Sequence, residues 1–257
     1  MTEETFDYVI VGTGSAGCVL ADRLTEGGGA SVLLLEYGGS DRSLYIQMPA
    51  ALSIPMNMPR YNWFFYTEPE PGLGGRRLHT PRGKVLGGSS SINGLVYVRG
   101  NPLDFERWAA EGAAGWAYRD VLPYFKRTER RNGGGDAYRG GEGKVQTRYG
   151  VLDNPLNHVW LEAGKQAGYP YTADMNGFQQ EGFGRMDMTV GGGRRSSAAN
   201  AYLRPAMRRR NLAVRTHSLA TRVLFDGRRA IGVAYRRGNA EHLARAMHVL
   251  VHQGTHR

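Results

Sequence analysis

Hydrophobic positions and glycine-rich turns alternate over the first 40 residues of the chain. Residues 6–11, FDYVIV, are an apolar run rich in aromatic and β-branched side chains, which predicts a buried parallel strand. Apolar residues then recur at helical spacing from Ala16 to Leu24, and the glycines at 27–29 are expected to end that helix. Residues 31–36, SVLLLE, predict a second buried strand that closes with an acid. This order of elements is typical of a βαβ unit.

Weaker patterns predict further elements along the rest of the chain. Helices are expected over residues 104–110, 118–128 and 155–168, and a strand over residues 183–189. Period-2 alternation predicts three strands over residues 212–216, 220–225 and 230–236, with Asp226-Gly227 as a hairpin turn. The Pro- and aromatic-rich residues 41–80 show little regular pattern, and residues 132–144, NGGGDAYRGGEGK, are expected to form a flexible loop.

The turn between the first strand and helix has the pattern G-x-G-x-x-G over residues 12–17. Gly12 allows a tight turn, Gly14 lets the backbone approach a pyrophosphate, and Gly17 lets the helix pack close to the strand. The helix N-terminus presents free N–H groups and a partial positive charge to phosphates. Glu36 can accept hydrogen bonds from ribose hydroxyls and disfavours a 2′-phosphate. The pattern predicts a bound dinucleotide, FAD or NAD; the alternative is a glycine-rich turn without a ligand.

A second glycine-rich segment spans residues 83–106, GKVLGGSSSINGLVYVRGNPLDFE. Residues 87–91 alone are a small-residue loop with N–H and hydroxyl donors, suited to an anionic or polar ligand or simply exposed to solvent. The whole segment resembles the first signature of the glucose–methanol–choline oxidoreductases, flavoenzymes that oxidise alcohols. The matching positions are Gly83, Lys84, Leu86, Gly87, Gly88, Ser89, Ser90, Ile92, Asn93, Tyr97, Gly100 and Glu106.

The resemblance implies FAD as the cofactor. Together with the N-terminal turn, it predicts a set of cofactor-binding residues: Gly12, Thr13, Gly14, Ser15, Ala16, Gly17, Glu36, Tyr37, Val85, Gly88, Ser89, Asn93, Gly94, Leu95, Val96 and Val223. Some family members attach FAD covalently through a histidine beside the signature asparagine. Ile92 stands at that position here, so the resemblance implies non-covalent FAD, and His79 is expected to be a surface or packing residue.

The resemblance extends to about residue 249 and implies an α/β fold. We expect an FAD-binding, Rossmann-like, doubly wound domain with part of an interleaved α+β substrate-binding domain. Residues 1–144 are predicted to be the N-terminal part of the FAD-binding domain. Residues 145–210 are predicted to belong to the substrate-binding domain, and residues 211–257 to return to the FAD-binding domain.

Residues 60–71, 174–190 and 193–203 resemble the choline dehydrogenase branch of the family. This implies oxidation of an alcohol, choline to betaine aldehyde, by hydride transfer to the flavin, with a quinone or oxygen as electron acceptor. The alternatives are an acceptor-dependent aliphatic alcohol dehydrogenase and a non-catalytic flavin-binding remnant. The aromatic residues 63–66, WFFY, are expected in a core or interface; a cage for a quaternary ammonium is the alternative.

No catalytic residue is assigned, because the catalytic histidine and the second signature of the family have no match in this sequence. The chain alone is therefore expected to be inactive, and the family pattern is expected to break off by truncation or frameshift near residue 251. His252 and His256 are interpreted as terminal surface residues. The remaining histidines are expected to be surface or packing residues: His158, His217, His242 and His248.

Composition narrows the class of protein. The 257 residues are 41% hydrophobic and 22% charged, as in ordinary globular proteins. No apolar run reaches the length of a membrane span, and the acidic N-terminus does not resemble a signal peptide, so a cytoplasmic location is expected. The single cysteine, Cys18, excludes an internal disulfide and is expected to be a packing residue. No metal site is predicted.

The net charge of +10 comes largely from arginines after residue 194, at 194–195, 208–210, 228–229 and 236–237. These groups are scattered over separate predicted elements and belong to no nucleic-acid-binding motif. They are interpreted as a solvated surface, with peripheral attachment to the inner face of an anionic membrane as the alternative. The expected partners are an alcohol and an electron acceptor, without nucleic acid.

Overall fold

The computed structural model describes residues 2–251. The chain divides into two compact units: unit 1 comprises Met1–Gly94 and Ser197–Arg257, and unit 2 comprises Leu95–Ser196. The chain thus leaves unit 1 once and returns to it. These bounds differ from the predicted divisions at residues 144 and 210, and the functional roles assigned to those stretches remain predictions.

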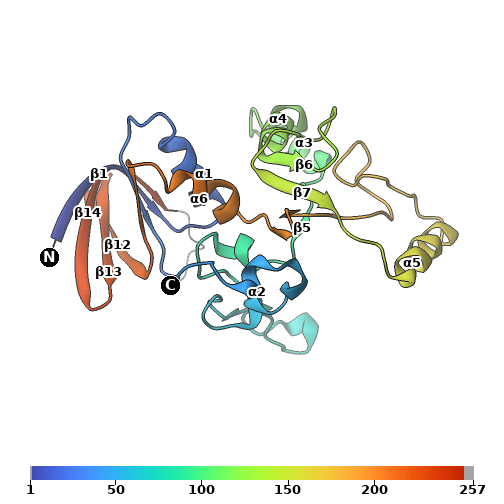
Figure 1. The fold of residues 1–257 in the computed structure, drawn as a ribbon, viewed down its shortest axis with the longest axis horizontal. Helices are drawn as coiled ribbons and strands as arrows, with labels where there is room; N and C mark the ends of the chain where they lie inside the picture. Colours follow the sequence, from blue (N-terminus) through green and yellow to red (C-terminus); the bar gives the residue numbers. More distant parts are fainter. Residues whose placement is uncertain (1, 252–257) are drawn as a thin grey trace. The chain divides into compact units, whose positions relative to one another are not determined.

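Unit 1 is built on a six-stranded sheet with the strand order β11-β2-β1-β14-β13-β12 (Figure 1). Its strands are β1 (Thr2–Val11), β2 (Val32–Leu35), β11 (Leu212–Arg215), β12 (Ser218–Asp226), β13 (Arg229–Arg237) and β14 (Ala240–Val251). The first four strands in this order are parallel, and β13 and β12 continue the sheet antiparallel. This parallel sheet with its crossover helix confirms the α/β, Rossmann-like prediction.

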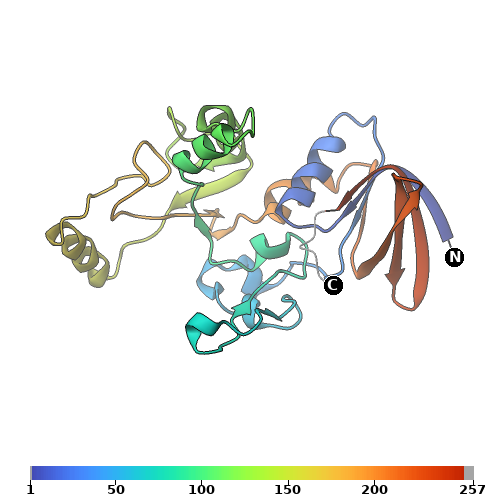
Figure 2. The same ribbon diagram turned by 180° about the vertical axis from the view of Figure 1, so that it is seen from behind.

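Buried apolar side chains on the central strands form a hydrophobic core on the sheet. Val9, Val11, Leu33 and Leu35 point to one face, where they pack with four further residues: Val233, Tyr235, Ala244 and Ala246. Helix α1 (Ser15–Leu24) packs against β1 and β2 and also lies close to η5 (Ala199–Leu203). Figure 2 shows α1 beside the sheet from behind. These contacts place the turn before α1 at the carboxyl end of β1.

Strand β1 begins at Thr2, four residues before the predicted start at Phe6. Its polar first half pairs with β14, and two ion pairs join it to residues of β14 and of β11, which is separated from β1 by β2 in the strand order. Arg245 Nε lies 2.8 Å from Glu3 Oε1, and Arg215 Nη2 lies 2.6 Å from Glu4 Oε1. The hydrophobic pattern did not predict residues 2–5 as strand, because these residues form ion pairs across the sheet instead of burying apolar side chains.

The remaining elements of unit 1 are short. They are α2 (Leu44–Gln47), η1 (Pro49–Ala51), η2 (Pro55–Asn57), β3 (Phe65–Tyr66), η3 (Pro71–Leu73), β4 (His79–Thr80), η4 (Gly88–Ser91), η5 and α6 (Arg204–Ala206). The β12–β13 hairpin closes through Gly227 and Arg228, because Asp226 pairs with Arg229. The turn therefore lies one residue later than predicted.

The arginine-rich region is not uniformly solvated, so that part of the prediction is wrong. Arg195 is 1% exposed. Arg209 donates to Asp22 Oδ1 at 3.1 Å and to Thr25 Oγ1 at 2.8 Å. Asp22 lies on the buried side of α1 and is 0% exposed, and a buried carboxylate needs such a partner. One of the clustered arginines thereby joins the segment after α6 to α1.

Unit 2 contains a four-stranded sheet with the order β5-β8-β7-β6. Its elements are β5 (Val96–Tyr97), α3 (Pro102–Ala110), α4 (Tyr118–Thr128), β6 (Glu129–Arg131), β7 (Val145–Tyr149), α5 (Pro155–Gln166), β8 (Asp187–Met188), β9 (Val190–Gly191) and β10 (Arg194–Arg195). The predicted helices are confirmed to within two residues at each end. Asn101 and Asn154 cap α3 and α5, each accepting from a backbone N–H two residues later.

The strand predicted over residues 183–189 is wrong in extent, since only Asp187 and Met188 join the sheet. The backbone of Phe183 instead pairs with the segment 170–172, where Thr172 N donates to Phe183 O at 2.9 Å. Across residues 2–251, no helix combines the length and apolar character that a membrane crossing requires.

Candidate functional site

The two glycine-rich segments meet in unit 1, although they lie about 70 positions apart in the sequence. A Cβ built on Gly88 would lie 2.7 Å from Gly14 Cα, and the φ of Gly88 is +55°. Likewise, a Cβ on Gly17 would lie 2.0 Å from Gly12 O, and the φ of Gly12 is +96°. Side chains at Gly17 and Gly88 would collide with backbone atoms, so glycine is required at both close approaches. The backbone of the second glycine-rich segment therefore packs directly against the turn before α1.

Helix α1 begins at Ser15, within the G-x-G-x-x-G turn. Its N-cap is Gly14, which offers no side-chain cap, and its first turn contains no acidic residue. The first intrahelical bond runs from Cys18 N to Gly14 O at 3.0 Å. The N–H groups of Ser15, Ala16 and Gly17 precede that bond and point toward the N-terminal end. An uncapped helix start without acids fits the diphosphate of a dinucleotide.

Glu36 follows β2 and is 4% exposed. Its Oε2 accepts from Thr13 N at 3.0 Å and from Thr13 Oγ1 at 2.6 Å, and its Oε1 accepts from Gly38 N at 2.8 Å. Burial raises the pKa of Glu36 above its usual value, although the hydrogen bonds from Thr13 and Gly38 act to lower it. The carboxylate thus fastens the glycine turn to the segment after β2. A carboxylate has further lone pairs, so a ribose contact stays a prediction.

A pocket of about 260 Å³ adjoins the residues that follow Glu36. Tyr37, Arg60, Lys84 and His217 are among its lining residues, and none of the lining residues is acidic. Tyr37 stacks on Trp63 with ring centroids 4.8 Å apart, and Lys84 Nζ lies 5.9 and 5.5 Å from these two centroids. The rings therefore already face an ammonium group of the chain, which argues against a choline cage at this place.

The serine hydroxyls of the second segment shape the loop itself. Ser90 Oγ donates to Gly87 O at 2.6 Å, and Ser91 Oγ donates to Leu86 O at 2.7 Å. Ser89 Oγ accepts from Gly83 N at 3.0 Å. The expectation of hydroxyl donors presented to a ligand is therefore wrong for Ser90 and Ser91, whose hydroxyls donate to backbone carbonyls within the loop.

The other predicted cofactor residues lie in several surroundings. Val85 is buried in a hydrophobic cluster with Ile46, Tyr61 and Ile92. Asn93 and Gly94 follow η4 in unit 1, whereas Leu95 and Val96 begin unit 2. Val223 lies on β12 and lines a separate hollow of about 860 Å³ on the antiparallel strands. The roles of all these residues toward FAD stay predictions.

Cys18 and most of the histidines pack against neighbouring side chains or lie on the surface, as predicted. Cys18 is 0% exposed, and burial raises the pKa of its thiol, which excludes a low-pKa reactive cysteine. His79 lies 3.0 Å from Asn62 Nδ2 and stacks on Phe64. The rings of His242 and His248 stack on tyrosines, and His158 is exposed on α5. His217 lines the pocket beside Tyr37. His252 and His256 lie outside the described residues.

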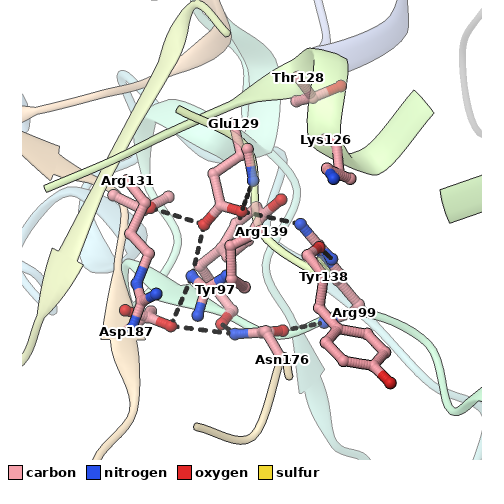
Figure 3. Close-up of polar contacts among 12 residues, drawn as sticks. Tyr97, Arg99, Lys126, Thr128, Glu129, Arg131, Tyr138, Arg139, Asn176 and Asp187 are labelled. Atoms are coloured by element: carbon pink, nitrogen blue, oxygen red, sulfur yellow. Dashed lines mark hydrogen bonds and ion pairs between the residues drawn. The ribbon is translucent and has the colours of Figure 1, made fainter. Parts of the chain in front are cut away.

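Unit 2 contains a buried ion cluster that sequence reasoning missed (Figure 3). Glu129, on β6, is 0% exposed and accepts from Arg99 Nη2 at 2.7 Å, Arg139 Nε at 3.1 Å and Thr147 Oγ1 at 2.8 Å. Burial raises the pKa of Glu129, but the hydrogen bonds from Arg139 and Thr147 outweigh it and hold the pKa below its usual value. Glu129 therefore stays ionised at neutral pH.

Arg139 is the cationic centre of this cluster and is also 0% exposed. Its Nη1 lies 2.6 Å from Asp174 Oδ1, and its Nη2 lies 2.8 Å from Asp187 Oδ2. Asn176 Nδ2 donates to Asp187 Oδ2 at 3.2 Å and to Tyr97 O at 2.9 Å. The predicted loop 132–144 is irregular, but Arg139 anchors its centre, so the expectation of a flexible loop does not hold there. Within residues 2–251, no cluster of potential metal ligands is present.

Known proteins resemble this chain in sequence over almost its whole length. A family model described as GMC oxidoreductase matches residues 6–256. An oxygen-dependent choline dehydrogenase of Photobacterium profundum is 58% identical over 231 residues, covering 89% of this chain and 41% of that protein. The corresponding protein of Vibrio vulnificus is 56% identical, covering 91% of this chain and 42% of that protein.

Solved structures agree with the sequence relatives. The crystal structure of pyridoxine 4-oxidase from Mesorbium loti superposes with a TM-score of 0.90 at 32% identity, covering 95% of this chain and 48% of that one. An FAD-dependent oxidoreductase from Chaetomium thermophilum gives a TM-score of 0.87 at 31% identity, covering 96% of this chain and 45% of that one. The chain spans less than half the length of these relatives.

Proposed function

The chain belongs to the GMC oxidoreductase family, and from this premise we propose that it binds FAD without a covalent link, as part of an enzyme that oxidises an alcohol. FAD, when bound, supplies the hydride acceptor for such an oxidation. The observation that carries the proposal is the close packing of Gly88 on Gly14. It joins the loop that resembles the family's flavin signature to the turn that resembles a dinucleotide site.

Different segments of the chain would bind different parts of FAD. The backbone N–H groups over residues 12–17 would hold the diphosphate, and Glu36 with Tyr37 the adenosine side. The second segment would hold the flavin side through Val85, Gly88, Ser89, Asn93, Gly94, Leu95 and Val96, and Val223 would meet the adenine. Non-covalent binding is supported by Ile92, which is 1% exposed in a hydrophobic cluster and has no nucleophilic atom.

The proposed substrate is choline, which would be oxidised to betaine aldehyde with oxygen or a quinone as electron acceptor. The support comes from the relatives named as oxygen-dependent choline dehydrogenases, which are 54–58% identical to this chain. An aliphatic alcohol is the alternative substrate. We propose no catalytic base among residues 2–251. A cytoplasmic location, and peripheral contact with an anionic membrane, remain predictions.

An absorption spectrum of the purified chain tests cofactor binding. Bands near ~370 and ~450 nm, typical of an oxidised flavin, are expected, and the flavin should stay in solution when denatured protein is removed. Flavin that precipitates with the protein would contradict non-covalent binding. A colourless chain that takes up no added FAD would overturn the proposed function.

Anaerobic bleaching of the flavin band then separates the candidate activities. Bleaching by choline, with no effect of an aliphatic alcohol, supports the choline proposal. The reverse result supports the aliphatic alternative. Bound flavin that neither alcohol reduces is the result expected of this chain alone, because no catalytic base is proposed among residues 2–251.

A further inference from the structure

We propose that unit 2 carries a binding site for a small phosphate-bearing ligand, separate from the proposed FAD function. The site is a pocket of about 310 Å³ on the β6–β7 pair. Arg130, Arg131 and Arg148 line it, together with Gln146 and two glycine turns, and none of its lining residues is acidic. A cavity of this kind selects for an anion.

Strand geometry explains how Arg130 and Arg148 reach one surface of the sheet. Successive side chains of a strand point to opposite faces of the sheet. Glu129 and Thr147 point into the ion cluster, with exposures of 0% and 1%. Arg130 pairs in register with Gln146, and all three residues Arg130, Gln146 and Arg148 are exposed. Strand spacing and rise place the Cα atoms of Arg130 and Arg148 roughly 8 Å apart on this face.

Among the described residues, no carboxylate pairs with Arg130 or Arg148, two of the three arginines that line the pocket. Arg131 is committed to Asp136 at 3.2 Å and to Tyr149 Oη at 2.7 Å. Because two like charges share one pocket, a bound anion would relieve their mutual repulsion.

Glycine at position 191 lets the Gln146 side chain lie against the backbone beside the pocket. A Cβ on Gly191 would lie 2.2 Å from Gln146 Oε1, so the absence of a side chain there makes room for the Gln146 amide. Gly192 and Gly133 have φ values of +55° and +114°, which fits glycine at both turns. The side-chain donors that line the pocket include the guanidinium groups of Arg130 and Arg148 and the amides of Gln146 and Asn132.

A phosphate group matches these donors better than a carboxylate does. A phosphomonoester carries a charge of about −1.5 to −2 at pH 7 and three strong acceptor oxygens. Guanidinium groups bind phosphate oxygens in bidentate fashion. A single carboxylate would compensate only one of the two arginines. A cationic alcohol such as choline would be repelled by the two arginines and would not bind in this pocket.

Calorimetric titration of the 257-residue chain with inorganic phosphate at low ionic strength tests the proposal. It is run with and without saturating FAD, so that the dinucleotide turn is filled in one arm. The test variant is Arg130→Gln/Arg148→Gln. The matched control is Arg228→Gln/Arg229→Gln, which removes two equally exposed charges from the β12–β13 hairpin.

We expect the wild type and the control variant to bind phosphate equally, and the test variant to bind at least about tenfold more weakly, because charge-assisted hydrogen bonds are lost. The site is overturned if the wild type gives no binding heat, if the test variant binds like the wild type, or if FAD abolishes binding. Acetate that binds as tightly as phosphate would overturn the ligand class. A chain that binds phosphate in this pattern but takes up no FAD would refute only the proposed function.

Discussion

Replacing Glu129 with glutamine tests whether the buried ion cluster holds unit 2 together. Glu129→Gln keeps the size of the side chain but turns one acceptor oxygen into an NH₂ donor. In the wild type, the carboxylate accepts from Arg99, Arg139 and Thr147, and also from Gly140 N at 3.1 Å. The substitution leaves two arginines, which are 5% and 0% exposed, without their shared negative partner.

The expected loss follows from this burial. Removing one partner of a buried ion pair costs about 3–5 kcal/mol in the free energy of unfolding. Arg139 retains Asp174 and Asp187 in the variant, so we expect the lower end, about 3 kcal/mol. That loss is a large share of the free energy of unfolding of a typical domain, about 5–15 kcal/mol. For a domain of about 100 residues, it corresponds to a fall in Tm of roughly 12 °C or more.

The loss should also depend on pH, with a sign set by the pKa of Glu129. Hydrogen bonds from Arg139 and Thr147 outweigh burial and hold that pKa below its value in the unfolded chain, about 4.5. The contribution of ionised Glu129 to the free energy of unfolding is therefore complete above the pKa that Glu129 has in the unfolded chain. It is lost as the pH falls through the lower pKa that Glu129 has in the folded chain. The difference in stability between wild type and variant should shrink over that acidic window.

Urea unfolding followed by tryptophan fluorescence provides the assay. Three of the four tryptophans, Trp108, Trp116 and Trp160, lie in unit 2, so the signal reports mainly on that unit. Asp104→Asn is the control, because it removes a 3.0 Å ion pair with Arg107 whose side chains are 52–61% exposed; less than about 1 kcal/mol should be lost. A loss below about 1 kcal/mol for Glu129→Gln at pH 7, or a loss unchanged by acid, would refute the reasoning.

Three further perturbations test unit 1. Gly88→Ala should weaken FAD binding at least about tenfold in a fluorescence titration, because residue 88 has a φ of +55° and its new Cβ would collide with Gly14 Cα. The control is Gly74→Ala, which should bind FAD normally, because residue 74 also has a positive φ, +65°, but has open space around it. Arg209→Met should lower the free energy of unfolding by about 2 kcal/mol in a urea titration, because it removes the guanidinium group that pairs with the buried carboxylate of Asp22; an unchanged midpoint would argue against a stabilising role for that pair. Cys18 should resist a thiol reagent in the native chain and react fully after unfolding in urea, and rapid native reaction would contradict its burial.

Local sequence patterns predicted much of the fold. The first strand, α1 and β2 follow from apolar runs and a glycine turn that lie within 36 consecutive residues. The helices α3 and α5 follow from helical patterns within the predicted ranges 104–110 and 155–168, although α3 begins two residues before its predicted start, at Pro102 behind the Asn101 cap. In each case the interactions that define the element are made by near neighbours in the chain, so the pattern can be read in one dimension.

Other features depend on partners that are distant in the sequence. The polar start of β1 pairs with β14, more than 200 positions later, and its charges resemble those of a solvated tail until that partner is known. The predicted strand at 183–189 failed for a related reason, because Phe183 pairs with a loop instead of the sheet. Arg195 and Arg209 resemble surface charges in the sequence, whereas in the structure one is buried and the other pairs with Asp22.

The sequence by itself determined that a glycine turn with the G-x-G-x-x-G pattern, and a second glycine loop resembling a flavin signature, are present, because both depend on residue types at fixed short spacings. Only the tertiary structure showed that Gly88 packs on Gly14, that Glu36 fastens Thr13, and that Glu129 and Arg139 form a buried ion cluster. Burial and charge pairing are properties of atoms that come together in space, and these atoms come from segments far apart in the chain.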